Sequence, residues 1–270
     1  MQASVMSIRE FLGLGGYTRP AEGYLSWQHL TFVTVLTVVM ILCAVVLGRR
    51  NRGLDAKRKN RVLILSAILI DGAELFKIVV MCIRSDDPMC WVRLLPLFLC
   101  SIQLIAIPLA AFSKGRIKEA ALDFVTLFGL LGALLGTYLA GNNYSCYPVI
   151  SLDNVVSGFT HCISGFAALY IMISGMASMK KKNIPLTIAI LGGFCVAAYV
   201  VNICVDYNYM FLMRGDGTPY DILFNLVNGH PVVYPLSVVG LFVIYMGVYY
   251  AIYYAIRKRI GAKNVVSDRV

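Results

Sequence analysis

The chain has 270 residues, 59% of them hydrophobic, and its mean hydropathy is +0.75. These values exceed those of soluble domains, so we expect one membrane domain with no room for a soluble one. A net charge of +10 can indicate nucleic-acid binding, but here the basic residues are confined to short segments between apolar stretches. We therefore assign them to the membrane surface, where they meet anionic lipid headgroups, and expect no nucleic-acid partner.

Seven long apolar stretches predict an all-α bundle of seven transmembrane helices. A helix needs roughly 20 residues to cross the hydrocarbon core. The expected spans are residues 30–47, 62–83, 94–112, 120–140, 155–178, 185–206 and 232–256. Residues 1–29 show no signal-peptide pattern, and their apolar side chains predict a short segment at the outer interface. These side chains are Ile8, Phe11, Leu12 and Trp27.

Lys and Arg are concentrated in every second gap between the spans. The basic segments are residues 48–61, 113–119, 179–184 and 257–270. Because cytoplasmic loops carry this bias, we expect the N-terminus outside, the C-terminus inside and a multi-pass protein of the plasma membrane. The expected divisions are an outer segment, a seven-helix domain and a basic cytoplasmic tail. They cover residues 1–29, 30–256 and 257–270.

Ionisable side chains within spans are costly in lipid and mark candidate functional sites. In the second span, Glu74 and Lys77 are spaced to pair directly, either as a structural ion pair or as part of a site. Lys77, Cys100 and His161 all lie about six residues below the expected outer boundary, or roughly 9 Å at 1.5 Å per residue. Gln103 follows Cys100 by one turn. These side chains predict an outward-facing polar cavity in the outer half of the bilayer.

The end of the sixth span adds polar residues on the same expected side of the membrane. They are Asn202 and Asp206, followed by Asn208 and Tyr209 in the outer gap 207–231. That gap is long and partly apolar, which favours a lid or a re-entrant segment. In the fourth span, Gly132 and Gly136 have the small-xxx-small spacing of closely packed membrane helices.

The cysteines allow two interpretations and show no metal pattern. Cys90 and Cys146 both fall in expected outer gaps, where they form a disulfide or stay free thiols. The sequence has no CxxC or Cys/His spacing typical of zinc, so we expect no metal and no cofactor. Cys100 is either a small apolar filler or a nucleophile with His161 as its base.

Four segments resemble the bacterial YwaF-like integral membrane proteins, which are grouped with the eukaryotic transmembrane protein 164 family. They are PLFLCS (96–101), SGFTHCISGF (157–166), NYMFL (208–212) after Asn202, and GHPVVYPL (229–236). They follow one another in the family's order over most of the chain. The resemblance implies the membrane fold and, from the eukaryotic members, a thiol-dependent acyltransferase that makes ether phospholipids.

By this resemblance, His161 occupies the position of the family's histidine. The nucleophile falls either at Cys100 or at Leu97, which has no reactive group. The chain also has Phe98 where bacterial relatives carry a histidine.

Three function classes therefore remain open. The first is a membrane-embedded lipid acyltransferase with Cys100, or a bound water, as nucleophile and His161 as base. The second is a transporter or small-molecule-binding protein, and the third is a non-catalytic interaction protein. The residues expected to bind substrate or solute are Glu74, Lys77, Gln103, Asn202, Asp206, Asn208 and Tyr209. We expect membrane lipids as partners, with a lipid as the candidate substrate.

Overall fold

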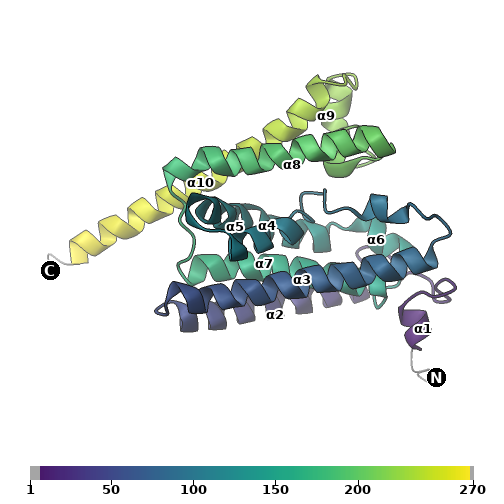
Figure 1. The fold of residues 1–270 in the computed structure, drawn as a ribbon, viewed down its shortest axis with the longest axis horizontal. Helices are drawn as coiled ribbons and strands as arrows, with labels where there is room; N and C mark the ends of the chain where they lie inside the picture. The colour runs from purple at the N-terminus through teal and green to yellow at the C-terminus, as the bar shows by residue number, and fades with distance from the viewer. Residues whose placement is uncertain (1–6, 268–270) are drawn as a thin grey trace. The chain divides into compact units, whose positions relative to one another are not determined.

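The computed structural model describes residues 7–267, with side chains up to residue 259, and no strand occurs in this range. The all-α class is confirmed for the described residues. The chain divides into two units, Met1–Thr187 and Ile188–Val270, and each is described by itself. Figure 1 shows the course of the helices within each unit.

The first unit is built around one central helix, α7 (Leu152–Ile173). Its elements are α1 (Ile8–Phe11), α2 (Trp27–Asn51), α3 (Ala56–Arg84), η1 (Cys90–Leu94), α4 (Gln103–Phe112), α5 (Gly115–Tyr138), α6 (Gly141–Cys146), α7 (Leu152–Ile173) and η2 (Lys181–Asn183). α7 packs against α2, α3 and α5, while α4 packs against α3 and α5. α7 is therefore the helix from which a side chain reaches the centre of this unit.

The second unit contains most of α8 (Ile184–Val205), then η3 (Tyr209–Phe211), α9 (Tyr220–Leu226) and α10 (Val233–Ser267). α9 packs on the start of α10, where the rings of Phe224 and Tyr234 lie 5.0 Å apart at an edge-to-face angle of 84°. The outer gap predicted from sequence thus contains two short helices. Arg269, in the predicted basic tail, lies outside the described residues.

Five helices are long and apolar enough to cross a membrane: α2, α5, α7, α8 and α10. The chain is therefore a multi-pass membrane protein. α3 has 29 residues, but Asp71, Glu74 and Lys77 lower the apolar character of its central part. Its exposed face is nevertheless apolar. That face includes Leu65, Ile68, Leu75, Phe76, Val79 and Ile83.

The predicted third span, residues 94–112, is wrong in its outer half. Only Gln103–Phe112 is α-helical, and ten residues of helix cover only about 15 Å. Leu95 is extended, with ψ of 147°, as expected for a residue that precedes a proline, here Pro96. The turn after it leaves an irregular stretch up to residue 102. At membrane depth such backbone is tolerated where protein covers it or where it lines a cavity.

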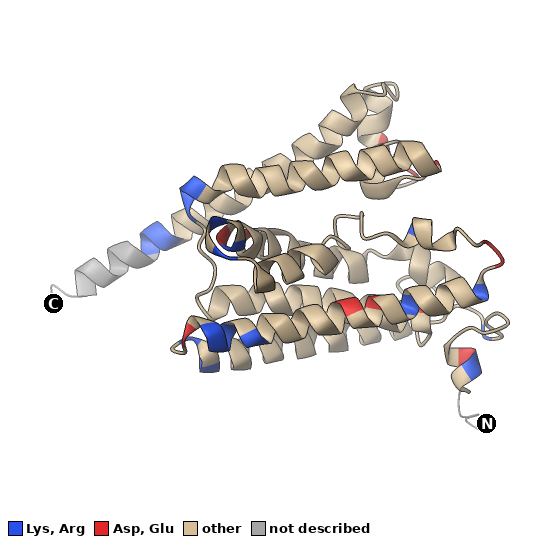
Figure 2. Ribbon diagram, viewed as in Figure 1, with Lys and Arg blue, Asp and Glu red and all other residues tan. Residues whose placement is uncertain are grey.

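Lys and Arg gather at one end of the first unit, where α2 meets α3 and where α5 begins (Figure 2). Several of them contact neighbouring segments at this end. Lys118 Nζ donates to Asn60 Oδ1 at 2.7 Å, and Arg116 donates to the carbonyl of Lys182 at 2.8 Å. Lys180 pairs with Glu119. This distribution matches the charge bias seen in the sequence.

The opposite end is held by a bidentate ion pair that the sequence analysis missed. Arg84, at the end of α3, donates to both carboxylate oxygens of Asp153 in the first turn of α7, at 2.7 and 2.8 Å. Asp153 is only 5% exposed, and Tyr17 also donates to it. Burial and the adjacent Asp153 carboxylate raise the pKa of Tyr17 to about 12. The N-terminal segment is thereby attached to the bundle.

The predicted interfacial residues of this segment have two different environments. Phe11 and Leu12 pack against the buried cluster of Val80, Leu152 and Val156. Ile8 and Trp27 are exposed.

Candidate functional site

Cys100 lies in the irregular stretch that interrupts the predicted third span. Residues 98–102 form a single helical turn, in which the Ile102 amide donates to the Phe98 carbonyl at 3.0 Å, and α4 starts directly after it. The thiol is half-buried. A position just before a helix favours the thiolate, because the positive end of the helix dipole lies there.

The resemblance leaves two positions for a nucleophile, Cys100 and Leu97. Only Cys100 has a side chain that can act as one. Leu97 is buried and aliphatic. The thiol at Cys100 approaches Ser101 Oγ at 3.9 Å.

Two glycines of α5 bring Cys100 and His161 onto one helix face. A Cβ atom at Gly132 would lie 3.3 Å from the Cα of Cys100, and one at Gly136 would overlap Nε2 of His161. Gly132 and Gly136 are one turn apart and share a face of the helix. The small-xxx-small spacing thus makes room for the two candidate catalytic residues as well as for close helix packing.

The tautomer of His161 follows from its hydrogen bond to Ser157. Nδ1 lies 2.7 Å from the carbonyl oxygen of Ser157, and because a carbonyl only accepts, Nδ1 must carry the proton. Nε2 is therefore the basic nitrogen. It is buried and has no hydrogen-bond partner among the described residues. A histidine held in this way has one nitrogen available for chemistry.

Cys100 and His161 interact with each other. The thiol and the imidazole are close enough to act as charged and hydrogen-bonding neighbours, although Nε2 makes no hydrogen bond of standard geometry. The matched depth of the two residues in the membrane stays a prediction.

Gln103 is the first residue of α4 and is completely buried. Neither its amide nitrogen nor its amide oxygen has a partner among the described residues. Leaving such a group unpaired costs roughly 1–3 kcal/mol, so a native protein retains it for a reason. Gln103 follows Cys100 by three residues, which places an unpaired amide donor one turn from the thiol.

The predicted pairing of Glu74 and Lys77 is confirmed. Lys77 Nζ lies 2.6 Å from Glu74 Oε1, and their side chains are 15% and 14% exposed. Lys77 is also near enough to His161 for its charge to act on the imidazole. Asp71, one turn before Glu74, has a buried carboxylate oxygen without a partner among the described residues.

The remaining predicted site residues belong to the second unit. Asn202 makes reciprocal bonds with the backbone of Tyr209, at 2.6 Å from the Tyr209 amide and 3.0 Å to its carbonyl. Asn208 accepts from the Met213 amide at 2.9 Å and donates to Asp216 at 2.7 Å. Asp206 is exposed. Asn202 and Asn208 thus hold the segment that follows α8, and their role in binding substrate stays a prediction.

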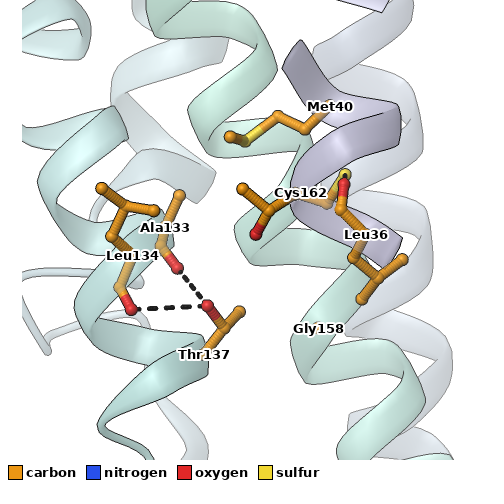
Figure 3. A pocket seen from close by; sticks show the side chains of 8 residues that line it. Leu36, Met40, Ala133, Leu134, Thr137, Gly158 and Cys162 are labelled. Atoms are coloured by element: carbon orange, nitrogen blue, oxygen red, sulfur yellow. Dashed lines mark hydrogen bonds between the residues drawn. The ribbon is translucent and has the colours of Figure 1, made fainter. Parts of the chain in front are cut away.

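A small apolar crevice lies between α2, α5 and α7 (Figure 3), with a cavity volume of about 10 Å³. Its lining residues are Leu36, Thr37, Met40, Ala133, Leu134, Thr137, Gly158 and Cys162. The hydroxyl of Thr137 is already used, since it donates to the Ala133 carbonyl at 2.8 Å. α7 contributes Gly158 and Cys162 to this lining, and His161 is not part of it.

These features define a class of protein. It is a multi-pass membrane protein in which a thiol on an interrupted span lies near an imidazole on a neighbouring helix. The chain belongs to the TMEM164 family, whose family model matches residues 24–253. No curated protein and no solved structure matches it. No group of three or more His, Cys, Asp or Glu residues suited to a metal ion occurs among the described residues.

Alanine should have unequal effects at the two α5 glycines, Gly132 and Gly136. We expect Gly136→Ala to displace the His161 imidazole, and so to change the rate at which Cys100 is alkylated by a maleimide. Gly132→Ala requires a shift of only a few tenths of an ångström, and alanine's helix propensity, about 1 kcal/mol better than glycine's, offsets it. The measurements are maleimide labelling and the unfolding temperature in detergent.

Gly72→Ala in α3 is the matched control, because nothing lies within 4 Å of the added Cβ. Equal labelling rates in Gly136→Ala and Gly72→Ala would contradict the placement of His161 against Gly136.

The Glu74–Lys77 pair predicts that each residue depends on its partner. Removing either one leaves an unpaired, largely buried charge, which costs about 3–5 kcal/mol. Glu74→Ala and Lys77→Ala should each lower the unfolding temperature, and Glu74→Gln with Lys77→Met should restore most of it. Arg93→Ala is the control, because it removes the cation of the exposed 3.8 Å Arg93–Asp87 pair. It should lower the free energy of unfolding by at most about 1 kcal/mol. Normal stability of both single variants would show that the pair contributes nothing.

Proposed function

We propose that this protein is a membrane-embedded lipid acyltransferase in which Cys100 is the nucleophile and His161 is the general base. The observation that carries the proposal is the interaction of Cys100 with His161. The Ser157 carbonyl fixes the tautomer of His161, and its Nε2 has no hydrogen-bond partner among the described residues. A reactive cysteine needs a nearby base and partial exposure, and both conditions are met. Membership of the TMEM164 family agrees with a membrane enzyme of this kind.

The reaction needs only groups that the chain and two lipids supply. Nε2 of His161 takes the Cys100 proton as the sulfur attacks an ester carbonyl of a phospholipid. The C–S bond forms, the C–O bond to the glycerol oxygen breaks, and that oxygen leaves with the proton from Nε2. The hydroxyl of a lysophospholipid then gives its proton to Nε2 and attacks the thioester. The C–S bond breaks, and the thiolate recovers the proton.

Other residues near the thiol have roles that this chemistry requires. The unpaired amide of Gln103 is suited to donate to the oxyanion that develops on the attacked carbonyl, a contact that typically contributes ~10²–10³ in rate. Lys77, paired with Glu74, is suited to a lipid phosphate.

The proposal includes seven spans, with α3 and the α4 region as the additional two, in the plasma membrane. The N-terminus is outside and the C-terminus is cytoplasmic, as the basic segments favour. With this orientation, Cys100 lies in the outer half of the bilayer. Residues 1–29 then form an outer segment, 30–256 the membrane domain and 257–270 a cytoplasmic tail.

The topology can be tested by labelling in intact cells. In a cysteine-free background, single cysteines at the exposed positions Asp86 and Asp216 should react with an impermeant maleimide, because both lie on the proposed outer side. A cysteine at Lys181, on the basic side, should react only after permeabilisation. Labelling of Lys181→Cys in sealed cells would overturn the seven-span arrangement.

The acyl transfer can be tested with protein in nanodiscs that contain a phospholipid with an alkyne-labelled acyl chain. We expect a hydroxylamine-sensitive label on the denatured protein, none on Cys100→Ala, and a rate reduced ~10²–10⁴-fold in His161→Ala, as for loss of a general base. Cys43→Ser, at an exposed cysteine of α2, is the control and should label like the wild type.

One outcome separates this proposal from its main alternative, a protein that binds a polar solute. The unpaired Gln103 amide and Asp71 oxygen support that alternative. If Cys100→Ser keeps full lipid transfer while His161→Ala loses it, the thiol mechanism is wrong and a histidine-centred site remains. If neither the wild type nor any variant forms the thioester or transfers an acyl chain, the solute-binding alternative is favoured.

A further inference from the structure

A second pair of reactive side chains lies in the first unit, apart from Cys100 and His161. The Sγ atom of Cys82, near the end of α3, is 3.0 Å from the Sγ atom of Cys90, the first residue of η1. Both thiols are half-buried. The sequence analysis considered Cys146 as the partner of Cys90, but the structure sets Cys90 against Cys82 and leaves Cys146 exposed.

The segment between the two cysteines is accessible and well formed. Asp86, Pro88 and Met89 are exposed in the turn between them, so a soluble reagent can approach the pair. The turn is held by its own bonds, since the Asp87 carboxylate accepts from the Met89 amide at 2.8 Å and the Cys90 amide donates to the Asp87 carbonyl at 3.1 Å. These bonds hold Cys90 against α3 with both thiols reduced.

We propose that Cys82 and Cys90 form a disulfide by exchange with an external disulfide. One thiol loses its proton and attacks the reagent, releasing one thiol and leaving a mixed disulfide. The second cysteine then attacks the first sulfur and releases the other reagent thiol. In total, two protein thiols are oxidised and one external disulfide is reduced to two thiols. Disulfides of this kind persist on the oxidising side of a membrane.

The bond has a structural consequence for the segment that carries Cys100. It joins the last turns of α3 to η1, and η1 leads directly into the irregular stretch that ends at the Cys100 turn. The disulfide would therefore restrain the start of that stretch. Formation of the bond does not depend on acyl transfer, because neither cysteine takes part in the proposed reaction.

Tryptic mapping tests the proposal. Cleavage after Lys77, Arg84 and Arg93 places the two cysteines in separate peptides, 78–84 and 85–93. After treatment of the purified, reduced protein with oxidised glutathione and quenching with N-ethylmaleimide, mass spectrometry should detect these two peptides as one linked species. The link should disappear on reduction. The readout requires no enzymatic activity, so failure of the acyltransferase proposal leaves this test intact.

Three variants give the test its controls. In Cys90→Ser, the second exchange step is impossible, so peptide 78–84 should keep a glutathione adduct. In Cys82→Ser, peptide 85–93 should keep it instead. Cys146→Ser should leave the yield of the linked species unchanged. The proposal is overturned if the wild type carries separate glutathione adducts on the two peptides, or if Cys90 links to the peptide that contains Cys146.

Discussion

The close approach of α5 and α7 is the constraint on which the rest of the first unit depends. A Cβ at Gly129 would lie 2.8 Å from the Ser164 carbonyl, and one at Gly165 would lie 2.8 Å from the Cβ of Ala133. Lipid supplies no hydrophobic force between helices, so packing at this distance stabilises the pair through dispersion and interhelical hydrogen bonds. One such bond runs from Ser164 Oγ to the Gly129 carbonyl at 3.1 Å.

The same contact decides where the imidazole lies. His161 continues the row of small residues on α7, but its ring is large, and only the missing side chain of Gly136 accommodates it. The ring is therefore held by packing on one side and by the Ser157 carbonyl on the other. A base that is held in both ways loses little entropy when a substrate arrives, which is the physical meaning of preorganisation.

α7 is also held at both of its ends by buried carboxylates. At one end, Asp153 accepts two bonds from Arg84. Beyond the other end, Asp123 of α5 accepts from the amides of Ser178 and Met179 at 3.0 and 2.8 Å. The carboxylates limit movement of α7 along its axis, while the small residues limit its distance from α5.

The amino-acid sequence by itself determined the helical membrane fold, because long apolar stretches have no other stable form in lipid. It also determined the Glu74–Lys77 pair, since a spacing of three residues brings two side chains together on any helix. The depth of Cys100 and His161 in the membrane, counted along the expected helices, stays a prediction. These features depend on local spacing alone.

The tertiary structure decided everything that depends on which faces meet. Hydropathy did not reveal the break after Pro96, because apolar coil and apolar helix have the same composition. Spacing did not identify Cys82 as the neighbour of Cys90, because the turn at Asp87 sets that contact. The burial of Asp153 and the role of Gly136 were equally hidden. The burial of Asp153 and the role of Gly136 each depend on a partner far along the chain, and the choice of such partners is made by packing between helices.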